Sequence, residues 1–326
     1  MVLSIIIPVY NVEKYIVGCL ESIYSQGVDE SRFEVIIVND GTKDYSIEKV
    51  QSIIEQKDNC TLINQENQGL SVARNTGLRN AKGKYVWFVD SDDQVAPESL
   101  KSILDLLEKR KEDLVAFNVL ERDELTCLDK KARPFAINTP KCLFDQSYTG
   151  EQALGMFHKG LVQRYIIRRV FLFDKELFFF PGVWYEDDQL LVRLFCFIKD
   201  IYVSSIISYI YLLRQNGSIM STLSIRTVID SYKLIFSWEL FLKENHINKA
   251  KRNWVNFNIY RYYKYILSLK EEKIDGYETY MKGKWHKAKF SLLFYALKSG
   301  RFLNFKSFVR AMFSLFFPKL FQSVMR

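Results

Sequence analysis

A pair of aspartates two residues apart follows an apolar run within the first third of the chain. Asp90 and Asp92 come directly after Tyr85–Val89, which has the composition of a buried strand. Side chains at positions i and i+2 of an extended segment point the same way, so both carboxylates can converge on one point. Mg²⁺ and Mn²⁺ take oxygen ligands, often carboxylates together with the phosphates of a nucleotide. The pair therefore predicts a site for a metal–nucleotide complex. The alternative is a surface acidic loop that caps a helix beginning near Pro97.

Strand and helix patterns alternate through the first 110 residues. Apolar runs predict strands at Val2–Val9, Phe33–Val38, Thr61–Ile63 and Tyr85–Val89. Apolar residues at helical spacing predict helices at 15–24 with Asn11 as a cap, at Ile47–Ile54, at Gly69–Ala81 and at Pro97–Lys111. This alternation is typical of an α/β fold with a mainly parallel sheet covered by helices, in which ligands bind at the carboxyl ends of the strands. Asp40, Asp90 and Asp92 all follow predicted strands, so we expect them at that edge.

The composition limits the class of protein. With 326 residues, 48% of them hydrophobic, the chain can bury the core of one large domain and an appendage. Its 5 scattered cysteines form no Cys-x-x-Cys pair and its 3 histidines are dispersed. This usage argues against a disulfide framework and a zinc site, and for a reducing compartment. No secretion signal and no apolar run of about 20 residues is visible, so we expect a cytoplasmic protein.

The last part of the chain is strongly basic. Thr279–Arg326 holds ten Lys and Arg and no acidic residue, whereas the rest of the chain is close to neutral. Phenylalanine and leucine alternate with the basic residues, and at helical spacing they would form an apolar stripe beside a basic face. The pattern favours two interpretations about equally: an anionic membrane surface as partner, or a pair of helices packed on the preceding domain. Nucleic acid ranks below both, because nothing upstream resembles a nucleic-acid-binding module.

Four segments of the chain resemble, in order and spacing, the pattern of glycosyltransferase family 2: Ser4–Asn11, Val38–Asp44, Asn67–Asn75 and Asp90–Asp93. The resemblance implies a catalytic domain with the GT-A fold over residues 1–220 and leaves 221–326 as a helical region. It also implies a glycosyltransferase of the kind that makes bacterial surface polysaccharides, among other products. A polymerising synthase of the family would usually carry transmembrane helices and a Gln-x-x-Arg-Trp motif. Neither is visible, so we expect an enzyme that adds a single sugar.

The resemblance assigns the nucleotide to residues near the first two strands. It implies that Asp40 accepts a hydrogen bond from the base, such as one from uracil N3–H. It also implies that backbone near Pro8, Val9 and Tyr10 contacts the nucleoside. We therefore expect a uridine diphosphate sugar as the donor. The alternative is that Asp40 stabilises the turn before Gly41.

The same resemblance makes Asp92 the direct ligand of Mn²⁺ or Mg²⁺. It places Asp90 near the ribose or a metal-linked water, and Ser91 in the same donor-binding loop. Asp93 is expected to cap a helix or to face solvent. Arg74 is expected either beside the nucleotide or in an ion pair with a strand-end acid, and it can serve both roles by orienting Asp90.

A second acidic cluster, Trp184–Gln189, resembles the Glu-Asp motif of the family. The resemblance implies that Asp187 is the catalytic base, which takes the proton of an acceptor hydroxyl. The alternative is an acidic first turn of a helix, which the helix dipole favours, and three consecutive acids leave the register open by one residue. Farther on, residues 209–219 resemble an aromatic–Arg–Ser-Ile stretch, which implies that Arg214 covers the diphosphate. There the alternative is a strand that ends in a turn at Asn216-Gly217.

These expectations combine into an inverting, metal-dependent transferase that acts on the hydroxyl of a glycan acceptor. A basic and aromatic tail fits an acceptor carried on a membrane lipid such as a polyprenyl diphosphate, with the enzyme at the inner face of the cell membrane. A nucleotidyltransferase would be expected to show a glycine-rich phosphate loop where this chain has Pro8–Asn11. A non-catalytic scaffold that binds nucleotide sugars would not need Asp187.

Overall fold

The computed structural model of this chain describes residues 1–133, 144–154, 160–214, 223–272 and 274–300. The chain divides into two compact units. The first comprises Met1–Gly182 and Glu186–Gly217, and the second comprises Val183–Tyr185 and Ser218–Arg326. The predicted domain boundary, at residue 220, lies outside the described residues.

The first unit is built on the parallel sheet that the sequence predicts. Strands β1 (Leu3–Val9), β2 (Phe33–Asn39), β3 (Cys60–Asn64) and β4 (Tyr85–Phe88) pair in parallel in the order β3-β2-β1-β4. The helices that follow them are α1 (Ile16–Tyr24), α2 (Ser46–Ile54), α3 (Leu70–Asn80) and α4 (Ser99–Glu108). Every residue of β1 is buried, which is why this strand reads as a continuous apolar run and not as an alternating one.

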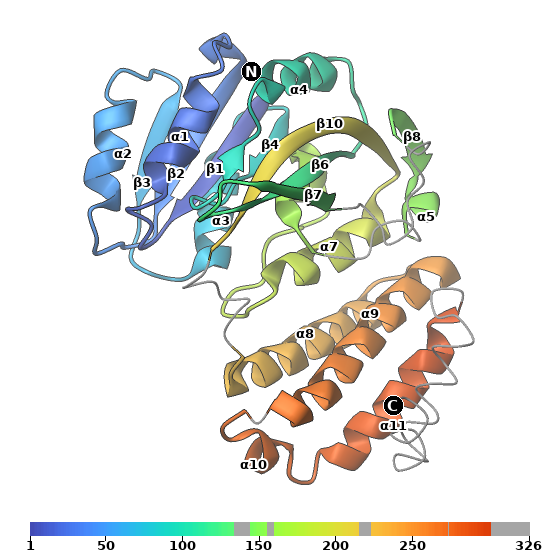
Figure 1. Ribbon diagram of the computed structural model, residues 1–326. Coiled ribbons are helices and arrows are strands. Elements are labelled where there is room, and N and C mark those ends of the chain that lie inside the picture. The colour runs from blue at the N-terminus through green and yellow to red at the C-terminus, as the bar shows by residue number, and fades with distance from the viewer. Residues whose placement is uncertain (134–143, 155–159, 215–222, 273, 301–326) are drawn as a thin grey trace. The chain divides into compact units, whose positions relative to one another are not determined.

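Helices cover both faces of these strands (Figure 1). Leu3, Ile5 and Ile7 of β1 share one core with apolar residues of α1, α2 and α4. Ile6 points to the opposite face, where α3 lies so close that a Cβ on Gly77 would stand 2.3 Å from Ile6 Cγ2. The absence of a side chain at Gly77 therefore sets the distance between α3 and the sheet.

The predicted cap of the first helix is wrong. α1 begins at Ile16, and Tyr15 is its N-cap residue without a side-chain cap hydrogen bond. Asn11 instead has a φ of 53° in the turn after β1, and its N–H donates to Thr42 Oγ1 at 2.8 Å. Asparagine tolerates this left-handed conformation better than most residues. Its presence here marks a turn between β1 and the helix.

Beyond β4 the sheet becomes mixed. It continues through β9 (Tyr165–Arg168), β6 (Leu114–Asp123), β10 (Asp200–Leu213) and β5 (Gln94–Val95), with β7 (Asp129–Arg133) on β6 and β8 (Gln146–Thr149) on β10. β9 runs antiparallel to both β4 and β6, whereas β6 and β10 run parallel to each other. The helices of this part are α5 (Gly150–Ala153), α6 (Arg169–Asp174) and α7 (Glu186–Phe197).

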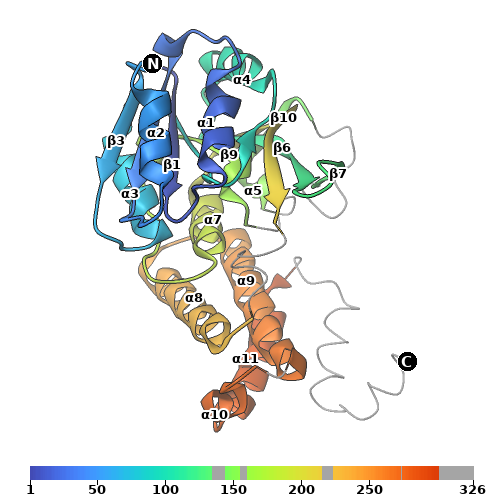
Figure 2. The same cartoon turned by 60° about the vertical axis from the view of Figure 1, so that its left-hand side comes forward.

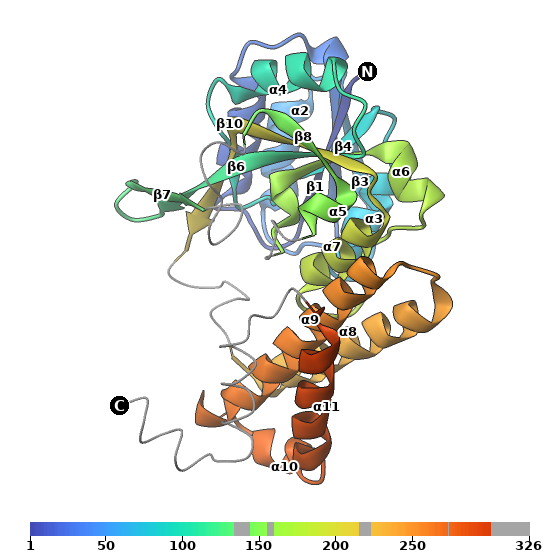
Figure 3. The same ribbon diagram turned by 90° about the vertical axis from the view of Figure 1, so that its right-hand side faces the viewer.

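The described part of the second unit is helical, as its sequence predicts. It contains α8 (Ile225–Glu244), α9 (Lys249–Ser268), α10 (Tyr277–Met281) and α11 (Trp285–Lys298). α9 packs against α8 and α11, and the three run side by side in Figures 2 and 3. No helix among the described residues is both long and apolar enough to cross a membrane. The predicted basic tail is described only as far as residue 300, which includes α11.

Candidate active site

The parallel strands bring acidic residues to one edge of the sheet. β1 and β2 stay paired to their last residues, Val9 beside Asn39, and Asp40 follows at once. On the other side of β1, β4 ends at Phe88, shortly before Asp90. Asp40 and Asp90 therefore both lie at the carboxyl edge of the parallel strands, where ligands of such sheets bind.

The loop after β4 holds a compact cluster of carboxylates. One oxygen each of Asp90, Asp92 and Asp93 lies within 4.8 Å of the others. Burial, followed by the charge of Asp90, raises the pKa of Asp92. Hard oxygen donors at this spacing, with an excess of negative charge, fit a divalent cation such as Mn²⁺ or Mg²⁺. The cluster is therefore a candidate site for a divalent cation, and the ion itself stays a prediction.

The expectation that Asp93 faces solvent or caps a helix is wrong. Its side chain is 2% exposed, its Oδ2 accepts a hydrogen bond from the Tyr209 hydroxyl at 2.7 Å, and its Oδ1 accepts one from Leu212 N–H at 2.8 Å. Both donors belong to β10. Burial, with the neighbouring charges of Asp92 and Asp90, raises the pKa of Asp93 well above its ordinary value. Asp93 thus joins the acidic loop to the end of β10.

Arg214 follows β10 directly and reaches the same loop. Its Nη2 lies 2.6 Å from Asp92 Oδ2, and both side chains are about one fifth exposed. The guanidinium also stands over the ring of Tyr15, 5.4 Å from its centroid. Asp92, the predicted metal ligand, is therefore paired with a cation of the protein itself. A metal ion that bound Oδ2 of Asp92 would displace Arg214 from that oxygen.

Arg74 on α3 joins the two acidic clusters of the sequence. It is 1% exposed, and its Nη2 lies 2.7 Å from Asp90 Oδ1. Its Nη1 lies 2.8 Å from Glu186 Oε1 and 2.8 Å from Asp187 Oδ1. The predicted ion pair with a strand-end acid is confirmed, and two partners that the sequence did not indicate are added. One buried cation thus faces three carboxylates and holds the loop after β4 beside the start of α7.

Asp187 lies in the first turn of α7, together with Glu186 and Asp188. Its Oδ2 accepts a hydrogen bond from Val162 N–H at 3.1 Å, while Asp188 Oδ1 accepts one from Gly160 N–H at 2.8 Å. The pKa of Asp187 is raised to about 7, and burial is the largest cause. The charge of Arg74 lowers this pKa, whereas the charges of Glu186 and Asp90 contribute to its rise. A carboxyl with a pKa near neutrality is well suited to act as a general base.

Gln163 is a member of this site that sequence patterns did not indicate. It is 2% exposed, and its Nε2 donates to Asp90 Oδ2 at 2.5 Å. Its Oε1 is buried without a hydrogen-bond partner in the described part of the chain. Because Arg74 holds one oxygen of Asp90 and Gln163 the other, the orientation of this carboxylate is fixed from both sides. No motif marks Gln163, since its only signal is the contact itself.

Asp40 lies at the same edge but is already hydrogen-bonded within the protein. It is 3% exposed; its Oδ1 accepts from Gln65 Nε2 at 2.7 Å and Gln68 N–H at 2.9 Å, and its Oδ2 accepts from Gly69 N–H at 2.8 Å. A carboxylate offers about four acceptor positions, so these bonds leave about one. The hydrogen bonds of Asp40 thus support the loop before α3, whereas at the predicted turn Asn39 Oδ1 accepts a hydrogen bond from Thr42 N–H at 2.9 Å.

The remaining predicted residues also lie near the carboxyl edge. Pro8 and Val9 are buried at the end of β1, and Tyr10, which follows them, is 46% exposed. Ser91 is buried between Asp90 and Asp92. Their predicted contacts with a nucleotide stay predictions.

Comparisons with known proteins agree on one family and one fold. The family model for "Glycosyl transferase family 2" matches residues 4–178. The chain is 28% identical over 231 residues to "Uncharacterized glycosyltransferase EpsJ" of Bacillus subtilis, which covers 70% of this chain and 65% of that protein. It is 26% identical over 227 residues to "Poly(ribitol-phosphate) beta-glucosyltransferase" of Bacillus spizizenii, covering 68% of this chain and 34% of that protein.

Among solved structures, residues 1–349 of S. aureus TarS in complex with UDP-GlcNAc match with a TM-score of 0.71 and 20% identity, over 96% of this chain and 87% of that one. This likeness confirms the GT-A fold that the sequence resemblance implies. The chain spans about two thirds of the first relative and about one third of the second.

Proposed function

Because the chain belongs to glycosyl transferase family 2, we propose that it transfers a sugar from a nucleoside diphosphate donor to the hydroxyl of a glycan acceptor, with inversion. The observation that carries this proposal is the position of Arg74. It ties Asp90, in the cluster suited to a metal ion, to Asp187, whose pKa of about 7 is that of a general base. A site that only bound a nucleotide sugar would have no use for the second group.

In the proposed reaction, Asp187 takes the proton of the acceptor hydroxyl while that oxygen attacks the anomeric carbon. The new glycosidic bond forms as the bond from the anomeric carbon to the diphosphate oxygen breaks, and the nucleoside diphosphate leaves with the electron pair. Asp92 and Asp90 would hold Mn²⁺ or Mg²⁺, which supplies Lewis acidity toward the leaving diphosphate. Arg74 keeps the base oriented, and Arg214, once released from Asp92, is free to neutralise the diphosphate.

A uridine diphosphate sugar is the proposed donor. Support comes from S. aureus TarS, whose residues 1–349 have been solved in complex with UDP-GlcNAc. For the uracil ring of the donor we propose contacts with the backbone near Pro8, Val9 and Tyr10. Asp40 has about one acceptor position left for a ring N–H, so its larger effect is on the loop that it supports.

The proposed acceptor is a glycan of a surface polysaccharide, carried on a lipid such as a polyprenyl diphosphate at the inner face of the cell membrane. The name of one relative, a poly(ribitol-phosphate) glucosyltransferase, supports a surface polymer. The basic residues of α11 and beyond support an anionic membrane surface. Sedimentation of the full chain with phosphatidylglycerol vesicles tests this part: binding that falls with added salt is expected. Equal recovery with phosphatidylcholine vesicles would count against it.

The transfer itself is tested by donor binding and hydrolysis across a panel of nucleotide sugars, for the wild type and for Asp92→Ala. We expect binding of a uridine diphosphate sugar in Mn²⁺ that is lost with a chelator and lost in the variant. Binding that survives both the chelator and Asp92→Ala would contradict the metal site. Binding without hydrolysis or transfer to any acceptor would indicate a scaffold that holds nucleotide sugars.

A further inference from the structure

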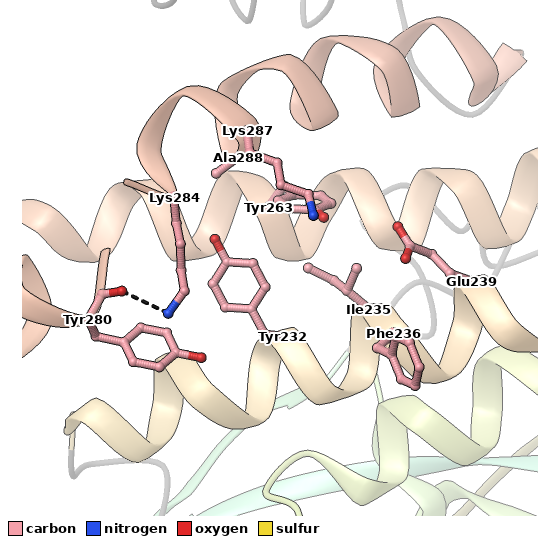
Figure 4. A pocket seen from close by; sticks show the side chains of 9 residues that line it. All are labelled: Tyr232, Ile235, Phe236, Glu239, Tyr263, Tyr280, Lys284, Lys287 and Ala288. Atoms are coloured by element: carbon pink, nitrogen blue, oxygen red, sulfur yellow. Dashed lines mark hydrogen bonds between the residues drawn. The ribbon is translucent and has the colours of Figure 1, made fainter. Parts of the chain in front are cut away.

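The second unit contains a cavity of about 300 Å³ that lies apart from the acidic residues described above. Residues of α8, α9 and α11 and of the α10 segment line it (Figure 4): Tyr232, Ile235, Phe236, Glu239, Tyr263, Tyr280, Lys284, Lys287 and Ala288. Small-molecule sites in proteins have volumes of roughly 300–1,000 Å³. The cavity is therefore large enough for a ligand of the size of one sugar ring or a short polyol.

Tyrosine rings form a fixed wall of this cavity. Tyr232 stands edge-on to Tyr263, with ring centroids 6.1 Å apart, and 6.2 Å from Tyr280. Tyr263 in turn stacks on Tyr295, with ring centroids 6.0 Å apart and an interplanar angle of 16°. Burial raises the pKa of Tyr232, and its hydroxyl donates a weak hydrogen bond to Met281 Sδ at 3.7 Å. Rigid aromatic faces beside phenolic hydroxyls suit a ligand with both C–H faces and hydroxyl groups.

Two lysines line the cavity. Lys284 Nζ donates to the carbonyl oxygen of Tyr280 at 2.9 Å and lies 3.4 Å from the centroid of the Tyr280 ring. Lys287 lines the cavity one turn farther along. Within the described part of the chain, neither ammonium group has a carboxylate partner. Two lysines that line one cavity and have no carboxylate partner among the described residues are candidates to hold a phosphate group.

One carboxylate, that of Glu239, lines the same cavity. Glu239 accepts a hydrogen bond from the Tyr295 hydroxyl at 2.7 Å, which leaves acceptor positions on its carboxylate. In the view of Figure 4, Glu239 and Lys284 lie at opposite sides of the lining, with Tyr232 and Ile235 between them. A ligand that fits this lining carries an anionic group for a lysine and hydroxyl groups that donate to Glu239.

From this arrangement we propose that the cavity binds a phosphorylated sugar or polyol. The phosphate is held by Lys284 and Lys287, the hydroxyl groups donate to Glu239, and the carbon chain or ring lies on the tyrosines. This site is separate from the proposed donor site, so the binding itself does not depend on the proposed function. A role of the cavity as a subsite for a phosphate-bearing acceptor, in contrast, rests on the proposed function.

Isothermal titration of the full chain tests the proposal with glucose 6-phosphate and glycerol 3-phosphate, and with inorganic phosphate and glucose as partial ligands. Excess UDP and Mn²⁺ are present throughout to occupy the proposed donor site. The variants are Lys284→Gln, Lys287→Gln and Glu239→Gln. Lys282→Gln is the matched control, because it removes the same charge from an exposed lysine of the same segment that does not line the cavity.

We expect saturable binding of a sugar or polyol phosphate that weakens about tenfold or more with either cavity lysine changed, since hydrogen bonds to charged groups are worth about 1.5–3 kcal/mol. Lys282→Gln should leave the affinity within about twofold. Glu239→Gln should weaken the phosphorylated ligands and leave inorganic phosphate unchanged.

The proposal is overturned if no phosphorylated ligand binds saturably up to about 10 mM, a concentration that detects interactions weaker than 4 kcal/mol. It is equally overturned if inorganic phosphate binds as tightly as glucose 6-phosphate, or if the cavity variants match the wild type. Titration of UDP into the same variants separates the two sites. A wild type that does not bind UDP would contradict the proposed function and would leave the test of the cavity unaffected.

Discussion

Replacing Arg74 tests how the candidate base is controlled. In Arg74→Met the three carboxylates of Asp90, Glu186 and Asp187 lose their shared cation. Of the charges around Asp187, Arg74 is the one that lowers its pKa, and the pKa is still about 7 in its presence. Removing Arg74 therefore raises the pKa of Asp187 further. A base has to be ionised to accept a proton, so activity rises with pH through this pKa, and the rise should move to higher pH in the variant.

The size of the effect follows from the distance. An opposite charge within hydrogen-bonding range lowers a carboxylate pKa by about 1–3 units. The midpoint of the pH–activity curve should therefore rise by that amount in Arg74→Met. At pH 7 the ionised fraction of Asp187 then falls from about one half to between roughly a tenth and a thousandth, which lowers kcat/KM about 5- to 500-fold. The loss should shrink as the pH is raised.

The assay is kcat/KM as a function of pH, followed by release of the nucleoside diphosphate. Arg74→Lys is the matched variant, because it keeps the charge but not the planar fork that reaches both sides; its midpoint should lie between those of the wild type and Arg74→Met. Urea unfolding is measured alongside, since removing one partner of a buried ion pair costs roughly 3–5 kcal/mol. Folded variants with lower activity but an unchanged pH midpoint would refute the role given to Arg74.

Three further predictions concern single side chains. Asp187→Asn should lower kcat by roughly 10²–10⁴-fold and leave the Kd of the donor unchanged; turnover at the wild-type rate would show that the base is elsewhere. Arg214→Gln should raise the affinity for Mn²⁺ in the absence of nucleotide, because Asp92 loses its competing partner, and should lower turnover. An unchanged affinity for Mn²⁺ would contradict the competition between Arg214 and the metal ion for Asp92. Gly77→Ala should destabilise the protein by about 1–3 kcal/mol, and in urea unfolding its cost should be smaller in an Ile6→Ala background if the clash is the cause.

The sequence predicts the parallel half of the sheet because its information is local. Buried strands such as β1 and β2 are apolar runs, and the helices between them have apolar residues at helical spacing. That alternation is enough to place Asp40 and Asp90 at the carboxyl edge. The antiparallel strand β9 carries no comparable signal, because a four-residue strand between irregular segments has neither length nor periodicity.

The contacts that build the site were less predictable, since they join residues far apart in the chain. Arg74 meets Asp187 across 113 positions, and Tyr209 meets Asp93 across 116. A motif identifies residue types that recur together, but it does not state which oxygen faces which donor. For that reason the sequence predicts Asp93 at a helix cap or in solvent and does not indicate Gln163. Asp40 shows the converse: a motif residue whose carboxylate turns out to support a loop.

The ion pair between Asp92 and Arg214 has a consequence for the order of ligand binding. A divalent cation that bound Oδ2 of Asp92 without a diphosphate would displace Arg214, whose Nη2 lies 2.6 Å from that oxygen, and leave the guanidinium without this anion. A diphosphate that arrives with the cation supplies that anion. The two binding free energies are thus coupled through one side chain, and linkage requires that each ligand raises the affinity for the other by the same factor. In the proposed enzyme, cation and donor would therefore bind cooperatively.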